Sequence, residues 1–378
     1  IKLNNLSVTG VLNAGGIMGL SNAAATYTFS GCSADNLEVI GGIGVGGMIG
    51  YIRHSSSIIK VDGKGKEFKI ISIKARNQHN GNGDFGLTSA GALFGYIYAA
   101  NDNGITVNNI NIKKAGGEST GYIGYYNDAN KNFVYAGGVI GCSDKGLTIS
   151  MDNVNLNNIN ISGKDAGGLI GYCGGKRKVT ISNCSVSTNE GCIIESTLSG
   201  EYSSGGIVGK YEKEADISIT DCTVDGYTFK GNKNCGGLIG RKLKANKMVC
   251  NNITIKDITV NTNEKGGGLV GDMSNGEMAG YNILVNGLSF GRYSGTGTVN
   301  TWGCITGRNE NKNIKLVGFS RQGIISTEKL VGTTSSNDYG DDGYVIFADY
   351  TNNAINNQNK YFSNIQASGA NVCREGKH

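Results

Sequence analysis

The stretch AGGLIGYCGG, residues 166–175, contains a six-residue glycine word that recurs along this chain. Other copies are AGGIMG from residue 14, VGGMIG from 45, AGALFG from 90, AGGVIG from 136, SGGIVG from 204, CGGLIG from 235 and GGGLVG from 266. Several neighbouring copies start 30 or 31 residues apart, and the other intervals are longer. This spacing predicts a structural repeat of about 31 residues that carries insertions.

A second word lies between the glycine words and alternates apolar and polar residues. Its copies are LNNLSV from residue 3, FSGCSA from 29, VNNINI from 107, ISNCSV from 181, ITDCTV from 219 and IKDITV from 255. Alternation with Val, Ile and Thr predicts short, half-buried strands. Three such strands and three turns fill one coil of a parallel β-helix, whereas helical repeats of similar length need long apolar stripes with helical spacing.

We therefore predict an all-β chain that folds as a parallel β-helix, or β-solenoid, of about ten rungs. The repeats predict a solenoid over residues 1–310. Residues 311–378 lack the glycine word and are expected to form a C-terminal cap or a junction to a further domain. The chain has 62 glycines and no proline, which suits a fold in which nearly every backbone N–H donates to a neighbouring strand.

Stacking explains why glycine must recur. Equivalent residues of successive rungs lie about 4.8 Å apart, so a position that needs positive φ or close backbone approach in one rung needs it in all. We expect the glycines of each word to mark corners of the coil. The predicted structural glycines are Gly15, Gly16, Gly46, Gly47, Gly137, Gly138, Gly167, Gly168, Gly205, Gly206, Gly236, Gly237, Gly267 and Gly268.

The second word repeats an amide or carboxylate at its third place. The residues there are Asn5, Asn109, Asn153 and Asn183, with Asp221 and Asp257 in later copies. We interpret this row as an asparagine ladder that bonds the turns above and below it. A ligand-binding row of amides is the alternative.

The pairing of GGLIG, residues 167–171, with ISNCSV, residues 181–186, resembles the GLUG-type repeat of large bacterial secreted and cell-surface proteins. Copies in that family read roughly Gly-Gly-Leu-Val-Gly, followed by an Ile-x-Asn-Cys-Tyr strand. The resemblance covers about residues 1–310, but Ser185 and Thr223 replace the aromatic residue after the cysteine. It implies an exported, adhesin-like repeat scaffold at the cell surface or outside the cell. It implies no catalytic residues, because the motif contains none.

Charge and hydrophobicity exclude two classes of partner. The net charge of +5 is small for 378 residues, and basic and acidic residues are interleaved, so nucleic acid is not an expected partner. No apolar run is long enough for a membrane-spanning helix.

The first strand word begins at residue 3 without a cap, so we expect the N-terminal edge, residues 1–8, to meet another copy or a longer parent chain.

The cysteines form neither a zinc motif nor an obvious disulfide framework. There are ten, without Cys-x-x-Cys spacing. Cys32, Cys184 and Cys222 share a position of the second word with Leu6, Ile110, Val154 and Ile258, so we expect buried free thiols there. Cys142 and Cys173 follow the glycine word in neighbouring rungs and are the candidate disulfide.

Two charged clusters are candidate binding sites, although solvated turns would give the same patterns. Basic residues follow two glycine words and could line one edge as a strip for a polyanion such as an acidic glycan: Arg177, Lys178, Arg241, Lys242 and Lys244. Carboxylates gather near the C-terminus and are the candidate Ca²⁺ ligands: Asp338, Asp341, Asp342 and Asp349. No other cofactor is predicted.

The sequence favours a non-enzymatic, structural or adhesive β-solenoid of a cell surface or extracellular fibre, able to associate end to end. We assign no catalytic residues. The alternative is a carbohydrate-active β-helix enzyme, similar to a polysaccharide lyase or hydrolase. Its groove would be built by the insertion at residues 51–70, which carries Arg53, His54, Asp62 and Lys64.

Overall fold

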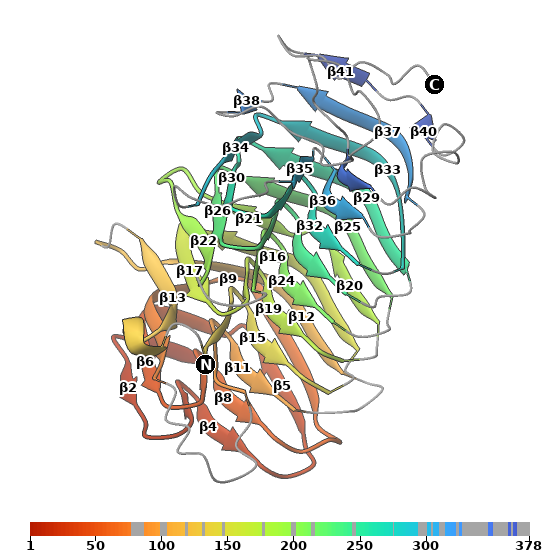
Figure 1. Cartoon of the computed structure of the whole chain (residues 1–378). Helices are drawn as coiled ribbons and strands as arrows, with labels where there is room; N and C mark the ends of the chain where they lie inside the picture. The colour runs from red at the N-terminus through yellow and green to blue at the C-terminus, as the bar shows by residue number, and fades with distance from the viewer. Residues whose placement is uncertain are drawn as a thin grey trace.

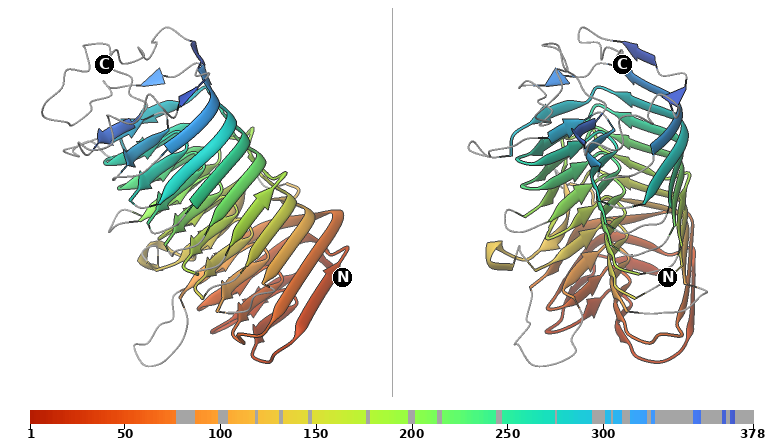
Figure 2. Two further views of the ribbon diagram at one scale, coloured as in Figure 1. Left: turned by 90° about the vertical axis from the view of Figure 1, so that its right-hand side faces the viewer. Right: turned by 45° about the vertical axis from the view of Figure 1, so that its right-hand side comes forward.

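The chain folds as a parallel β-solenoid, as its repeats predict. The computed structural model describes residues 1–76, 87–98, 104–117, 120–130, 133–145, 148–175, 178–197, 202–212, 216–243, 247–274, 276–293, 301–303, 305–309, 314–322, 325–326, 347–350, 362–363 and 366–368. The strands form three sheets of 22, 9 and 10 strands. Figures 1 and 2 show them stacked as successive coils along one axis. Apart from the short 3-10 helix η1 (Asp128–Asn130), the described secondary structure is β.

Each rung adds one or more strands to every sheet. The first sheet contains β1 (Lys2–Asn4), β2 (Ser7–Thr9), β5 (Thr26–Ser30), β6 (Ser33–Gly41), β9 (Ile58–Ala75), β12 (Ile105–Lys114), β13 (Gly121–Tyr125), β16 (Ile149–Asn157), β17 (Ile159–Gly163), β20 (Val179–Ser182), β21 (Ser185–Ser187), β22 (Ile193–Ser196), β25 (Ile217–Asp225), β26 (Thr228–Gly231), β29 (Lys247–Lys256), β30 (Thr259–Thr262), β33 (Glu277–Asn286), β34 (Ser289–Gly291), β37 (Ile314–Gln322), β38 (Ile325–Ser326), β40 (Phe362–Ser363) and β41 (Gln366–Ser368). The second contains β3 (Ala14–Gly15), β7 (Gly44–Gly46), β10 (Ser89–Gly91), β14 (Tyr135–Gly137), β18 (Ala166–Gly167), β23 (Ser203–Gly205), β27 (Asn234–Gly236), β31 (Lys265–Gly267) and β35 (Thr301–Gly303). The third contains β4 (Met18–Ser21), β8 (Ile49–Ile52), β11 (Phe94–Ile97), β15 (Ile140–Ser143), β19 (Ile170–Cys173), β24 (Val208–Tyr211), β28 (Ile239–Lys242), β32 (Val270–Met273), β36 (Thr306–Asn309) and β39 (Phe347–Tyr350).

Neighbouring rungs pair in parallel and in register. Ile217 of β25 lies opposite Met248 of β29, and Gly236 of β27 lies opposite Gly267 of β31. Both steps span 31 residues, which is the period read from the glycine words. The glycine word itself supplies the end of a second-sheet strand, the turn and the start of a third-sheet strand.

Alternating side chains fill one continuous core. In β25, Ile217, Ile219, Cys222 and Val224 are buried, and the residues between them are half-buried or exposed. The buried set repeats in the rungs above and below, because in-register stacking places each apolar residue over its equivalent. A rung therefore buries its apolar side only when its neighbours are present.

Asparagine at a left-handed corner joins the two halves of the long first-sheet strands. Asn109, Asn153 and Asn183 have φ of 53°, 53° and 52°. The Asn153 Nδ2 donates to Asn109 Oδ1 at 3.0 Å, and the Asn252 Nδ2 donates to Asp221 Oδ1 at 2.7 Å. These bonds join neighbouring rungs, so the row is an intramolecular ladder.

The first and last copies of the second word were aligned wrongly by sequence. Leu3 lies opposite Ala34, in the column of Phe68 and Ile112, so Asn5 stands at the corner after that column and Leu6 does not share the Cys32 column. In the rows of corner residues, Asn5 is bonded to Asn36 and not to the equivalents of Asn109. The residue opposite Cys222 is Ile253, so Asn252 occupies the ladder position of that rung, and Ile258 does not share the Cys222 column. Asp257 instead lies at the next corner, between β29 and β30, with φ of 49°. Both corners need left-handed residues, so their local sequences look alike.

Replacing Asn153 with alanine is expected to lower the free energy of unfolding by about 1 to 2 kcal/mol, because alanine is strained at positive φ. Asn153→Gly also removes the ladder bond but tolerates this backbone, so it is expected to cost clearly less. Urea unfolding of the two variants measures the difference. Equal losses would mean that the ladder bond, and not the backbone conformation, selects asparagine.

Positive φ and close backbone approach were the two expected reasons for the glycines of the glycine word. Positive φ is not the reason. None of the word's described glycines is among the residues with φ in the left-handed region. Close backbone approach explains it instead: a Cβ on Gly168 would lie 1.8 Å from the carbonyl oxygen of Gly206, and one on Gly237 would lie 2.2 Å from that of Gly268. Successive rungs touch there through their backbones.

The two ends of the described chain differ from the middle. At the first rung, β1 and β2 pair with β6, with Leu3 opposite Ala34 and Val8 opposite Val39. At the other end, β37 pairs in parallel with β40 and β41, and β36 pairs with β39. The sheets therefore continue beyond the predicted boundary at residue 310, although most of 311–378 lies outside the described residues.

Candidate functional site

The second and third sheets turn their outer sides toward each other along a seam. The Tyr135 ring in β14 lies 4.8 Å from the Tyr172 ring in β19, and the Lys265 ammonium in β31 lies 3.8 Å from a carboxylate oxygen of Asp272 in β32. Cys173, the residue after Tyr172, belongs to the main core, so the seam lies on the opposite side of the strand. We define the seam as Ser89, Tyr135, Asp165, Ser203, Asn234 and Lys265 of the second-sheet column with Tyr51, Tyr96, Cys142, Tyr172, Lys210, Arg241 and Asp272 of the third-sheet column.

The last glycine of each word lets the two sheets meet. A Cβ on Gly141 would lie 2.7 Å from the backbone N and O of Ala90, and one on Gly209 would lie 2.6 Å from the carbonyl oxygen of Ala166. A third-sheet strand thus lies with its backbone against the second sheet. The repeated glycine word therefore determines where the seam runs.

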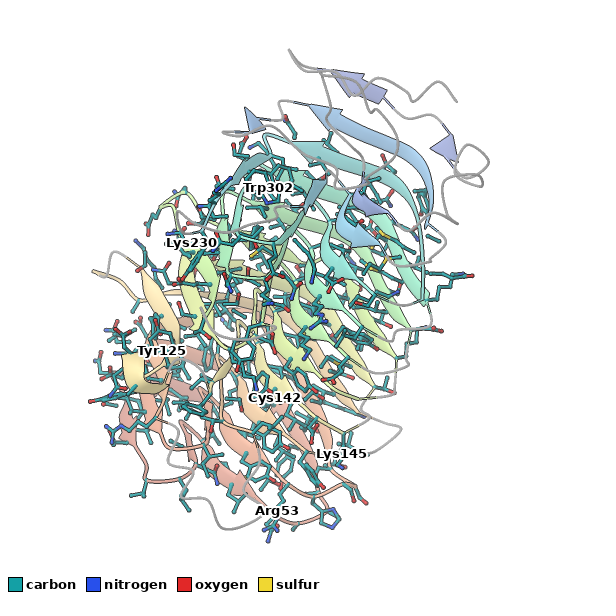
Figure 3. The ribbon with its side chains drawn as sticks, viewed as in Figure 1. Arg53, Tyr125, Cys142, Lys145, Lys230 and Trp302 are labelled. Carbon is teal, nitrogen blue, oxygen red and sulfur yellow. The ribbon has the colours of Figure 1, made fainter. Side chains whose placement is uncertain are left out.

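The half of the seam nearer the N-terminus is aromatic. Tyr51, Tyr96, Tyr135 and Tyr172 are 1–7% exposed and form a cluster with Cys142, separate from the main core. Cys142, labelled in Figure 3, lies on β15 near the middle of the solenoid. Burial raises the pKa of these phenols well above its usual value at Tyr96, Tyr135 and Tyr172, so they remain neutral.

The next rungs replace the aromatic residues with charges. The Arg241 Nε lies 3.0 Å from a carboxylate oxygen of Asp272, whose side chain is fully buried. Lys210 lies 3.7 Å from Glu212, and its ammonium is 5.6 Å from the centre of the Tyr172 ring. The cations keep some access to solvent, because the side chains of Lys210, Arg241 and Lys265 are 17%, 12% and 13% exposed.

Asp165 is the carboxylate in the second-sheet column of the charged half. Its Oδ1 accepts a hydrogen bond of 2.9 Å from the backbone N–H of Ser203, and its Oδ2 has no hydrogen-bond partner among the described residues. The Ser203 Oγ and the Asn234 Oδ1, in the next two rungs, are also buried without a partner. Burial raises the pKa of Asp165 to about 6, although Lys210 and Lys164 oppose the shift. The column thus presents three buried oxygens that can accept hydrogen bonds.

Asp165→Asn is expected to stabilise the protein at neutral pH. An unfolded aspartate titrates near pH 3.9, so the proton is held more tightly in the folded state, and stability falls as pH rises from about 4 to about 6. Asparagine keeps the Oδ1 acceptor and carries no charge. We expect a gain of about 2 to 3 kcal/mol at pH 7.5 and little difference at pH 3.5.

Chemical denaturation across this pH range measures the difference. Asp216→Asn, at an exposed position before β25, is the control and is expected to show no such trend. A wild-type protein that is the more stable of the two at pH 7.5 would contradict the assignment.

The structure does not test the predicted calcium cluster. Asp338, Asp341 and Asp342 lie outside the described residues. The backbone of Asp349 lies in β39, opposite Arg308 of β36. Within the part of the chain that the structure describes, no group of three His, Cys, Asp or Glu residues is arranged to hold a metal ion.

The candidate disulfide between Cys142 and Cys173 is not present. Cys142 lies opposite Tyr172, and Cys173 lies opposite Ser143, so the two cysteines occupy adjacent columns of the third sheet. Adjacent residues of a strand point to opposite sides, which places Cys142 in the seam and Cys173 in the main core. Both are buried free thiols.

The predicted polyanion strip is not assembled by the residues that can be placed. Lys178 is exposed before β20, Arg241 lies in the seam, and Lys242 points to the other side of β28. Lys242 is fully buried, and its Nζ donates to the carbonyl oxygen of Glu277 at 3.3 Å. Because successive side chains of a strand point to opposite sides, the neighbouring basic residues Arg241 and Lys242 do not share one surface. Arg177 and Lys244 lie outside the described residues.

The insertion considered for an enzyme groove forms much of the long strand β9. Asp62 lies 2.8 Å from the ammonium of Lys64 and accepts a hydrogen bond of 3.2 Å from Asn109. The His54 Nδ1 accepts a bond of 3.1 Å from the N–H of Ser56. Asp62 is thus part of the ladder of corner residues, and these contacts account for its low pKa of about 2.

Sequence reasoning found Arg241 but missed the other charged residues of the seam. A signal was available: Asp165 and Lys265 stand two residues before the paired glycines of a word, and Lys210 and Asp272 directly follow its last glycine. Aligning the residues that flank each word would have found both columns. Their contact across two sheets could not be read from the alignment.

No family model matches this chain, and no curated protein or solved structure matches it either. Among the described residues, no helix has the length and hydrophobicity needed to cross a membrane.

Proposed function

We propose that this chain is a non-enzymatic, structural or adhesive β-solenoid of a cell surface or extracellular fibre. The observation that carries the proposal is that outward polar side chains of the first sheet bond their equivalents in the next rung. Asn155 Nδ2 donates to Asn111 Oδ1 at 2.9 Å, and Ser185 Oγ donates to Asn155 Oδ1 at 2.7 Å. Such side chains hold rungs together. The resemblance to the GLUG-type repeat supports an exported location.

We further propose that an acidic glycan contacts the charged half of the seam. The side chains of Lys210 and Lys265 are 17% and 13% exposed, come from different sheets and carry charge that a polyanion would bind in competition with their carboxylate partners. Lys164 adds a third cation, whose ammonium lies 5.0 Å from the centre of the Tyr135 ring and 5.1 Å from that of Tyr202.

Retention on immobilised polysaccharides tests this binding. We expect the wild-type protein to be retained by a uronate polymer in a salt-dependent manner and the Lys164→Gln/Lys210→Gln variant to be retained at least fivefold more weakly. Lys60→Gln/Lys247→Gln removes two exposed cations elsewhere and is expected to behave as wild type. Equal retention of both variants would rule out the seam as the binding surface.

A carbohydrate-active enzyme is the second candidate, favoured by the pKa of about 6 at Asp165. Because Asp165 is fully buried, catalysis by its carboxyl group requires the seam to open locally. The same incubations therefore need a second readout, the release of new reducing ends or unsaturated products. Cleavage that Asp165→Asn abolishes would overturn the non-enzymatic proposal.

The first rung is proposed to be covered by a further rung of the same pattern, from a second copy or a longer parent chain. Apolar side chains are exposed there: Ile1, Val11, Leu12 and Leu20 are 59%, 72%, 42% and 44% exposed. Leu3→Asp/Asn4→Pro would place a charge and a non-donating residue on this edge; Asn5 is unsuitable because its N–H already donates to the carbonyl oxygen of Asp35 and its φ is 47°.

Sedimentation velocity distinguishes the two sources. Concentration-dependent association that this double variant abolishes would support a second copy. A wild-type chain that remains monomeric at high concentration would rule the second copy out.

A further inference from the structure

Two cysteines face each other in consecutive rungs of the first sheet. Ser182 lies opposite Thr220, and Ser185 lies opposite Thr223, which places Cys184 opposite Cys222. The N–H of Thr223 donates to the carbonyl oxygen of Cys184 at 3.0 Å, which keeps the rungs in this register. Among the eight described cysteines, strand register places two opposite each other only here.

The two thiols point the same way and interact. Cys184 Sγ lies 3.0 Å from the carbonyl oxygen of Ser182, and Cys222 Sγ lies 3.2 Å from that of Thr220, so each sulfur lies beside the residue two positions earlier. A hydrogen bond between the thiols raises the pKa of Cys184 and lowers the pKa of Cys222. Cys222 is therefore the better nucleophile of the pair.

The spacing of the backbones suits a disulfide. Paired strands lie about 4.8 Å apart, and disulfides join Cα atoms about 4.4 to 6.8 Å apart. Parallel Cα–Cβ bonds would leave the Cβ atoms slightly too far apart, so one must tilt toward the other. Cys184 can tilt because it lies in the gap between β20, which ends at Ser182, and β21, which begins at Ser185.

We propose that Cys184 and Cys222 are a redox site that forms a reversible disulfide between successive rungs. The oxidant is a disulfide donor, such as a small-molecule or protein disulfide. The Cys222 thiolate attacks the donor and releases one thiol, and Cys184 then loses its proton and attacks the Cys222 sulfur, which releases the second. Two electrons pass to the donor, which leaves as two thiols, and one S–S bond forms in this chain.

Burial determines when this exchange can occur. Cys184 and Cys222 are 2% and 1% exposed, so a donor reaches them only before the rungs pack or when they open locally. The bond would link two rungs that otherwise depend on non-covalent contacts. This inference does not depend on the proposed function, because it rests on the register and contacts of two neighbouring rungs.

Refolding the full chain in a glutathione redox buffer, followed by alkylation and non-reducing peptide mapping, tests the proposal. We expect a cross-linked peptide pair that contains Cys184 and Cys222. Cys184→Ser and Cys222→Ser should each abolish it, while Cys142→Ser and Cys173→Ser, which remove buried thiols elsewhere, should retain it. The oxidised protein should also unfold at a temperature at least about 4 °C higher than the reduced protein.

The wild-type map alone decides the outcome if a variant fails to fold. Alkylation of both residues after refolding under oxidising conditions, or pairing of either with a different cysteine, would overturn the proposal. So would an oxidised protein that unfolds at the lower temperature, since a strained bond would not link the rungs stably.

Discussion

Gly167→Ala is expected to lower the free energy of unfolding by about 3 to 5 kcal/mol. A Cβ at this position would lie 2.0 Å from the carbonyl oxygen of Ile170 and 2.5 Å from the backbone N of Gly209. Both neighbours are backbone atoms in packed strands, so no side chain can rotate away to make room. The rungs would have to separate or lose their register. Chemical denaturation, followed by far-ultraviolet circular dichroism, measures the loss.

Gly116→Ala is the matched control. Nothing lies within 4 Å of a Cβ built on Gly116, and its φ is outside the left-handed region. The same change of one methyl group is therefore expected to alter stability by less than about 0.5 kcal/mol. If Gly167→Ala were as mild as this control, close backbone approach would not explain the glycine word.

Replacing Arg241, the cation beside Asp272, is expected to cause the second large loss of stability. Asp272 is fully buried, and Arg241 lies against its carboxylate, so Arg241→Met would leave a buried charge with weaker compensation from Lys265 at 3.8 Å. Breaking such a pair from one side costs about 3 kcal/mol. Urea unfolding at pH 7 is the measurement.

Two further variants separate charge from packing. Adding Asp272→Asn to Arg241→Met is expected to recover part of the loss, because the uncompensated charge is gone. Lys178→Met, at an exposed position before β20, is expected to change stability by less than about 0.5 kcal/mol. Equal effects of Arg241→Met and Lys178→Met would show that the seam charges do not stabilise the fold.

The architecture could be predicted from local sequence because each local pattern recurs many times along the chain. Gly167 and Gly168 recur with their neighbours at a period of 31 residues, and only stacked rungs require that. Asn153 and its equivalents likewise predicted a ladder. The period could not show which corner needs positive φ, because close backbone approach selects glycine just as strongly.

The candidate sites were predicted less well, because they depend on which side of a strand each residue occupies. Arg241 and Lys242 are adjacent letters of one basic run, yet one lies in the seam and the other is buried on the opposite side of β28. Cys142 and Cys173 follow equivalent glycine words but stand one position apart in register. A shift of one residue reverses the direction of a side chain in a strand.

The sequence by itself therefore determined the solenoid, its period and the stacking of equivalent residues, since these follow from repetition along one chain. Only the tertiary structure decided the seam. Asp165 and Lys265 come from the second sheet, and Lys210 and Asp272 come from the third. The two columns meet because glycine backbones let those sheets approach, and the closeness of two sheets is a property of packed backbones that no single strand pattern contains.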